Sequence, residues 1–263
     1  MTTVNDILNF VQTLAPASMK MDWDNVGLLC GDRKQEVTSI LVALDPFEDV
    51  CEEARSVGAQ LIVTHHPLIF RPVKNVTEDT SVGRSIRRLI QYDISAINAH
   101  TNLDCAPGGV NDVLAARLGL TDVQVINPEG ATENGSPWGL LRQGMVQAQP
   151  LVQFMETVKR ELGCEGLRYV DAGRPVEKVA VGGGACGSEM MDAFDAGCDT
   201  FVTSDLKYNQ FWDAHDLGLN LIDAGHFATE NPVCAMLAAA ISGRFPEVSV
   251  KISENHRDCM KFF

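Results

Sequence analysis

Short apolar runs alternate with amphipathic segments along most of the chain. Three runs in the first half are rich in apolar residues: residues 39–44, 60–64 and 94–99. Such runs are typical of strands that are covered on both faces of a sheet. A segment with the pattern of a helix follows each of them: residues 47–57, 81–91 and 109–118. This alternation predicts a largely parallel sheet with helices on both faces.

A second series of strands and helices follows an interruption in the pattern. Residues 127–137 are rich in Gly, Pro, Asn, Glu and Ser, which is typical of a linker or a long turn. Four more strands are predicted beyond it: residues 167–170, 176–181, 200–203 and 219–223. We therefore expect an α/β protein with two βα-rich domains, residues 1–126 and 127–263, with mostly parallel sheets covered by helices. This boundary leaves open that elements near the C-terminus pack on the first domain.

Polar residues that can bind metals come directly after several of these strands. Ligands of parallel α/β sheets bind beyond the carboxyl ends of the strands, so these positions are candidates for a site. The candidates are His65 and His66 after one strand, His100 and Asp104 after the next, Asp205 after a third, and His226 with Glu230 after a fourth. Four of the six histidines of the chain therefore follow predicted strands.

Neutral imidazoles and carboxylates are common ligands of divalent metals, and a carboxylate can bridge two ions. Adjacent residues of a regular strand point to opposite faces, so His65 and His66 can serve two ions only if the backbone turns, as Pro67 favours. Structural alternatives remain open: a strand cap for the histidine pair, a turn for Asp104 and a first-turn helix carboxylate for Glu230. His100 fits either a ligand or a residue that orients one.

The composition excludes some classes of function. The formal net charge is −14, and binding to nucleic-acid backbones depends on basic patches, so such binding is not expected. None of the eight cysteines forms a CxxC pair, and no apolar run reaches membrane-spanning length. The first residues lack the basic and apolar regions of a signal peptide. These features predict a cytoplasmic protein without a membrane segment.

One glycine-rich stretch allows two interpretations. Gly182-Gly183-Gly184 follows a predicted strand, so its backbone N–H groups could hold an anion. It lacks the spacing of a dinucleotide-binding or P-loop motif, and a tight turn with close backbone approach is the alternative. Cys186 beside it has no histidine placed by the sequence to activate it, so we do not expect a cysteine hydrolase.

Taken together, these motifs resemble the NIF-three-like family of dinuclear metal proteins, labelled GTP cyclohydrolase I type 2 homologues. The motifs that carry the resemblance are residues 23–29, 64–68, 99–104 and 182–184, and residues 223–226 with Glu230. The resemblance implies a two-domain α/β subunit and a homohexameric ring whose metal sites face an inner cavity. It implies the metal ligands His65, His66, Asp104, His226 and Glu230, with Glu230 as the bridge.

The first functional hypothesis is a hydrolase with two divalent ions, for which this ligand set suits Zn, Fe, Mn, Co or Ni. The family label implies a small-molecule substrate of the nucleotide class. Glu230 and Asp205 are the candidate catalytic residues, with Asp205 as a proton carrier, and Lys207 and Tyr208 could contact an anionic substrate. Asn209 stands where the family often has a histidine, which removes a group that could move protons. The alternative is a non-catalytic metal-binding scaffold or a ring that binds a partner.

Overall fold

The computed structural model describes all 263 residues and divides the chain into two compact units. Unit 1 consists of Met1–Leu103 and Val233–Arg257, and unit 2 consists of Asp104–Pro232 and Asp258–Phe263. The chain thus enters the second unit at residue 104 instead of near residue 127. The reason is that residues 110–125 form a helix and a strand of the second sheet, whereas residues 249–252 complete the first sheet.

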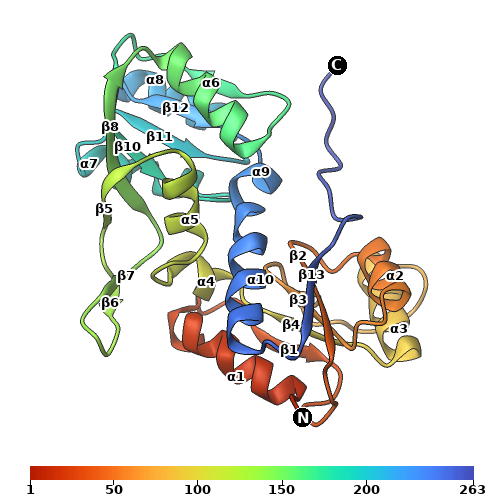
Figure 1. Cartoon of the computed structure of the whole chain (residues 1–263). Coiled ribbons are helices and arrows are strands. Elements are labelled where there is room, and N and C mark those ends of the chain that lie inside the picture. The colour runs from red at the N-terminus through yellow and green to blue at the C-terminus, as the bar shows by residue number, and fades with distance from the viewer. The chain divides into compact units, whose positions relative to one another are not determined.

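Unit 1 is built on a five-stranded sheet with the order β1-β4-β3-β2-β13 (Figure 1). Its strands are β1 (Gly27–Cys30), β2 (Ser39–Ala43), β3 (Leu61–Thr64), β4 (Ser95–Asn98) and β13 (Ser249–Ile252). All neighbours are parallel except β1, which is antiparallel to β4. The helices are α1 (Val4–Leu14), the 3-10 turn η1 (Ala17–Met19), α2 (Glu48–Ser56), α3 (Ser81–Tyr92) and α10 (Pro232–Arg244), which begins on the last residue of unit 2.

The two faces of this sheet are covered by different helices. Alternate strand residues such as Leu41, Ile62 and Ala96 pack with apolar residues of α2 and α3 in one buried cluster. Figure 1 shows α1 and α10 on the side away from α2 and α3. Burial of both faces explains why apolar residues predominate in the central strands β2 and β3.

The parallel register of unit 1 brings the carboxyl ends of three strands to the same level. Ala43 of β2 pairs with Thr64 of β3, and Thr64 pairs with Asn98 of β4. The residues that follow these three ends therefore meet at one edge of the sheet. Two of the three segments supply the candidate ligands His65, His66 and His100.

Unit 2 has a six-stranded sheet with the order β5-β8-β10-β11-β12-β9. Its strands are β5 (Thr121–Val125), β8 (Arg142–Gln149), β9 (Arg168–Val170), β10 (Val176–Val181), β11 (Thr200–Thr203) and β12 (Asn220–Asp223). The three central strands, β10 to β12, are parallel, and the flanking strands are antiparallel to their neighbours. The expected linker at residues 127–137 instead leads through the small hairpin β6 (Gly130–Ala131) and β7 (Pro137–Trp138), so β5 and β8 are joined without a crossover helix.

Helices cover both faces of the second sheet as well. One buried cluster joins Val179, Val202 and Ile222 to apolar residues of α5 (Val110–Arg117) and α6 (Leu151–Leu162). A second cluster joins Ala180, Phe201 and Leu221 to α7 (Met190–Asp195) and α8 (Tyr208–Leu217). Three short helices complete the fold: the 3-10 turn η2 (Gly187–Glu189), α4 (Thr101–Cys105) and α9 (His226–Glu230).

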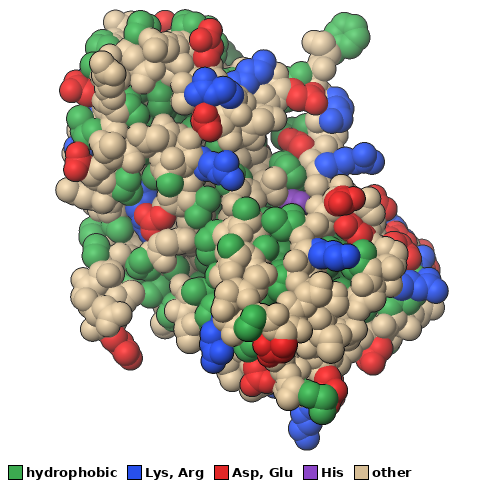
Figure 2. Space-filling model, viewed as in Figure 1, with side chains coloured by type: hydrophobic (Ala, Val, Ile, Leu, Met, Phe, Trp, Pro, Cys, Tyr) green, Lys and Arg blue, Asp and Glu red, His purple; other side chains and the backbone are tan.

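The surface of α2 and α3 mixes the two signs of charge. Glu48 is paired with both Arg84 and Arg88, and Arg87 is paired with Glu78. Figure 2 shows acidic and basic side chains interspersed over these helices instead of a continuous basic stripe. None of the helices is long and apolar enough to span a membrane.

Arg142 of β8 fixes the segment that follows Asp104. Its side chain is 1% exposed and forms hydrogen bonds with both carboxylate oxygens of Asp112, at 2.7 and 3.2 Å. It also donates to the backbone carbonyls of Cys105 and Ala106, at 3.3 and 3.2 Å. A buried guanidinium of this kind stabilises the fold only while all these acceptors are present.

We expect Arg142→Ala to lower the free energy of unfolding by about 3 kcal/mol, because it leaves Asp112 and the carbonyl groups without their donor. Urea unfolding followed by circular dichroism measures this change. Arg160→Ala is the matched control, since the Arg160–Glu161 pair is exposed and should contribute less than about 0.5 kcal/mol. Equal effects of the two substitutions would contradict the structural role of Arg142.

Candidate metal centre

Three histidines of unit 1 form a compact cluster at the carboxyl edge of the first sheet. The ring centroids of His65 and His66 are 5.0 Å apart, and that of His100 lies 5.2 Å from His65 and 5.6 Å from His66. One ring nitrogen of each residue lies within 4.8 Å of those of the other two. The structure therefore brings together the histidine pair and His100, which the sequence placed only at the ends of separate strands.

Each imidazole of this cluster is held by an oxygen acceptor at Nδ1. His65 Nδ1 donates to the carbonyl oxygen of Ala99 at 2.9 Å, and His66 Nδ1 lies 2.7 Å from Oδ1 of Asp45. His100 Nδ1 lies 2.8 Å from Oδ1 of Asp24. A carbonyl or carboxylate oxygen accepts a proton from Nδ1, which leaves the lone pair on Nε2. This arrangement is common for metal-binding histidines, because it fixes both the tautomer and the ring orientation.

Asp24 is a partner of the histidine cluster that the sequence did not single out by itself. Burial alone would raise the pKa of Asp24, but hydrogen bonds from His100 and Thr101 outweigh it and hold the pKa well below its usual range. Thr101 donates to Oδ2 of Asp24 through its N–H at 3.0 Å and its hydroxyl at 2.6 Å. Asp24 is thus an ionised acceptor that orients His100.

Unit 2 supplies two buried carboxylates and an imidazole. Asp104 is 7% exposed and Glu230 is 4% exposed, and a carboxylate oxygen of one lies within 4.8 Å of an oxygen of the other. His226 Nε2 lies 3.0 Å from Oε2 of Glu230, and the two residues share one face of α9 at positions i and i+4. Two buried carboxylates at this distance repel each other, and a bound cation would neutralise them.

Asp205 holds His226 in the same way that Asp24 holds His100. Its Oδ2 lies 2.7 Å from Nδ1 of His226. Asp205 adopts a left-handed backbone with φ of 54°, a conformation that is uncommon outside glycine and often occurs at functional sites. Its side chain is 49% exposed, so the carboxylate contacts both His226 and solvent.

The three glycines after β10 do not form an anion site. The N–H of Gly182 donates to Val202, that of Gly183 to Oδ1 of Asn111, and that of Gly184 to the hydroxyl of Thr229. All three donors are therefore used within unit 2. The glycines serve close packing instead, because a Cβ on Gly184 would collide with Oε1 of Glu230.

Cys186 has the properties of a buried structural thiol. Burial raises the pKa of Cys186 well above its usual value, and Asp104 and Glu189 add to this effect by their negative charges. Its Sγ contacts the carbonyl oxygen of Gly183 at 3.2 Å. Since only a thiolate is an effective nucleophile, Cys186 is not an activated one.

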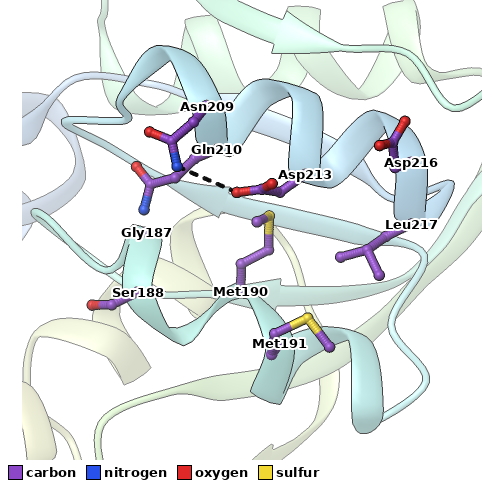
Figure 3. Close-up of a pocket in the computed structure, with 9 residues that line it drawn as sticks. All are labelled: Gly187, Ser188, Met190, Met191, Asn209, Gln210, Asp213, Asp216 and Leu217. Carbon is purple, nitrogen blue, oxygen red and sulfur yellow. Dashed lines mark hydrogen bonds between the residues drawn. The ribbon is translucent and has the colours of Figure 1, made fainter.

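A cavity of about 490 Å³ lies between α7 and α8, and none of the candidate ligands lines it (Figure 3). It is lined by Gly187, Ser188, Met190, Met191, Asn209, Gln210, Asp213, Asp216 and Leu217. Asn209 belongs to this cavity, and its amide donates to Asp213 at 3.4 Å. The neighbouring Tyr208 is 79% exposed. The position that often carries histidine in the resembled family therefore lies on α8 in this chain and faces Asp213.

Comparison with known proteins agrees with the motifs. The model of the family described as Duf34/NIF3 (NGG1p interacting factor 3) matches residues 2–258. The chain belongs to the Duf34/NIF3 family. The resemblance inferred from the sequence motifs is thereby confirmed.

Relatives of this NIF3 family chain match it over almost its whole length. A Clostridium perfringens protein named GTP cyclohydrolase 1 type 2 homolog is 36% identical and covers 98% of this chain and 99% of its own. A Streptomyces coelicolor protein of the same name is 35% identical over 92% of this chain and 86% of its own.

Solved structures show the same fold. A Bacillus cereus protein related to NIF3 matches with a TM-score of 0.94 and 26% identity, over 100% of this chain and 99% of that one. A hypothetical protein of Staphylococcus aureus matches with a TM-score of 0.93 and 30% identity, over 99% of both chains. The α/β fold class is therefore confirmed.

We expect Gly184→Ala to destabilise unit 2 more than substitution of another glycine with the same backbone. Gly184 has φ of 64° and Gly163 has φ of 68°, but only at Gly184 would a Cβ meet a neighbour. Gly163→Ala should cost about 1 kcal/mol of unfolding free energy, and Gly184→Ala about 2–4 kcal/mol. Urea unfolding of both variants measures the difference, and equal midpoints would show that Glu230 does not depend on this glycine.

Proposed function

We propose that this protein is a hydrolase that depends on two divalent metal ions. The ligands in this proposal are His65, His66, Asp104, His226 and Glu230, with Glu230 as the bridge between the ions. The observation that carries it is that each half of this set is organised for a cation within its own unit. In unit 1 the imidazoles have their Nδ1 atoms fixed, and in unit 2 two buried carboxylates lie close together.

Candidate ligands lie close in sequence to points at which the chain passes from one unit to the other. Unit 1 ends at Leu103 and unit 2 begins with the candidate ligand Asp104, four positions after His100. The chain returns to unit 1 after Pro232, two residues beyond Glu230. Two of the three crossings therefore lie close in sequence to candidate ligands, and the third follows Arg257. In this proposal, the free energy of metal binding would add to the stability of the folded chain.

The donor set fits first-row divalent metals. It combines imidazole nitrogens with carboxylate oxygens and contains no thiolate, which suits Zn, Fe, Mn, Co or Ni. When bound, a pair of such ions lowers the pKa of a shared water and stabilises negative charge that develops on the substrate. The chain's own contribution is orientation: Asp24 and Asp45 hold the imidazoles of His100 and His66, and Asp205 holds that of His226.

Asp205 is also our candidate for a proton carrier. Its Oδ2 binds the Nδ1 proton of His226, while half of the side chain remains in contact with solvent. A carboxylate in this position can exchange a proton with water without leaving His226. The nucleotide class of substrate, a cytoplasmic location and a homohexameric ring belong to the same proposal, and their support is the family to which the chain belongs.

The metal ligands are tested by elemental analysis and by titration of the metal into chelator-treated protein. We expect Glu230→Gln and His65→Ala to reduce metal content well below that of the unaltered protein. Asp205→Asn should weaken metal binding by about 10–100-fold, since it removes only the group that orients His226.

Asp216→Asn is the matched control for Asp205→Asn. Asp216 lies 3.2 Å from Nδ1 of His215, but both side chains are exposed and neither is a candidate ligand. Metal affinity should not change in this variant. Normal metal content in Glu230→Gln would contradict the proposed bridge.

The hydrolase activity is tested with protein purified without chelator, screened against nucleotides and phosphoesters with and without the metal found in it. We expect turnover that requires the metal and is lost in Asp104→Ala. Full metal occupancy without turnover of any compound would favour the alternative, a metal-binding scaffold or a ring that binds a partner. The native mass of the same preparation tests the hexamer.

A further inference from the structure

Two exposed aromatic side chains of unit 1 stand beside the histidine cluster. Trp23 is 62% exposed and Phe70 is 45% exposed. Their ring centroids are 5.7 Å apart, and both lie close to the ring of His100, at 6.3 Å from Trp23 and 6.1 Å from Phe70. Large aromatic groups that remain exposed side by side contribute little to a core and often mark a binding surface.

The three rings are arranged as a corner. The plane of Trp23 is inclined by 74° to that of Phe70 and by 73° to that of His100, and the planes of Phe70 and His100 meet at 87°. A flat ligand ring can therefore stack on one aromatic plane and contact the second with its edge. Since His100 also belongs to the histidine cluster, a ring bound there would lie next to the metal ligands.

Hydrogen bonds hold the two aromatic loops in place. Asn25 donates from its amide to the carbonyl oxygen of Ile69 at 2.6 Å, which ties the Trp23 loop to the Phe70 loop. The carbonyl oxygen of Asn25 accepts from the amide of Asn98 at 3.1 Å. The three adjacent residues 23–25 thus have different roles. Asp24 orients His100, Asn25 connects the two loops, and the ring of Trp23 is exposed to solvent.

The Phe70 loop also carries positive charge. Residues 70–76 are all exposed and include Arg71 and Lys74. The chain as a whole has a net charge of −14, so two cationic side chains in the exposed loop that follows Phe70 are a local exception to its acidic character. Trp23 lies between two acidic residues, of which Asp22 is exposed and Asp24 is buried against His100. The loops therefore combine aromatic planes with groups that can bind an anion.

We propose that Trp23 and Phe70 form a subsite for a flat heteroaromatic ring that carries an anionic group, as in a nucleobase with its phosphate. This rests on the proposed function, because it names the class of substrate that the metal centre would receive. Trp23 stacks on the ring, Phe70 bounds it at the side, and Arg71 and Lys74 attract the anion.

The test uses the full-length, metal-loaded protein and calorimetric titration with three probes: GMP, guanosine and ribose 5-phosphate. We expect GMP to bind at least about 5-fold more tightly than ribose 5-phosphate. Trp23→Ala should weaken GMP binding by about 5–100-fold and leave ribose 5-phosphate unchanged, whereas Trp23→Phe should retain most of the affinity. Phe70→Ala should have a smaller effect of the same kind.

Trp212→Ala is the matched control, since Trp212 is 54% exposed on α8 of unit 2 and should not affect any probe. Equal binding of GMP and ribose 5-phosphate would overturn the proposal, as would a Trp23→Ala variant that binds GMP normally. A changed native mass of Trp23→Ala would also overturn it, because the ring would then serve contact between copies.

Metal content, measured on the same samples, separates this proposal from the proposed function. If the protein binds metal but shows no preference for GMP that depends on Trp23, the aromatic subsite is wrong and the metal centre stands. If that preference is present in protein that takes up no metal, the subsite stands and the metal-dependent function is wrong.

Discussion

The register of the parallel strands is the constraint on which both halves of the candidate centre depend. Ala43, Thr64 and Asn98 lie at the same level in the first sheet, so the residues after them share one edge. Val181, Val202 and Ile222 are aligned in the same way in the second sheet. Ligands of parallel α/β sheets bind beyond these ends, which is where the candidate ligands lie.

Three histidines of the candidate centre are each oriented by an aspartate. Asp45 contacts His66, Asp24 contacts His100 and Asp205 contacts His226. In each pair the contact is made at Nδ1, and it fixes the orientation of the ring. An imidazole that is fixed in this way loses less conformational freedom when a metal binds, which favours binding over an unsupported histidine.

The sequence was sufficient to predict the α/β class, most strands and helices, and the positions of the histidines, since these follow from local periodicity and from residues at strand ends. It allowed for C-terminal elements that pack back on the first domain, as β13 does on β2, but it did not predict that the second unit begins at Asp104. Asp24 was missed as a partner of His100 because 76 positions separate them. Asp45 could have been identified from the sequence, because it lies just beyond the end of β2, as His65 and His66 do beyond β3.

The backbone N–H groups of Gly182, Gly183 and Gly184 are not available to bind an anionic substrate, because they already form hydrogen bonds within unit 2. Backbone N–H groups after a strand are the usual way for an α/β protein to bind phosphate, but those of residues 182–184 already donate within unit 2. Negative charge on a substrate must then be balanced by cations. In a chain with net charge −14, the proposed metal ions and the exposed side chains of Arg71 and Lys74 would supply that positive charge. In the proposed function, bound metal ions would take part in recognition of the anion, and the exposed aromatic rings would distinguish one anionic compound from another.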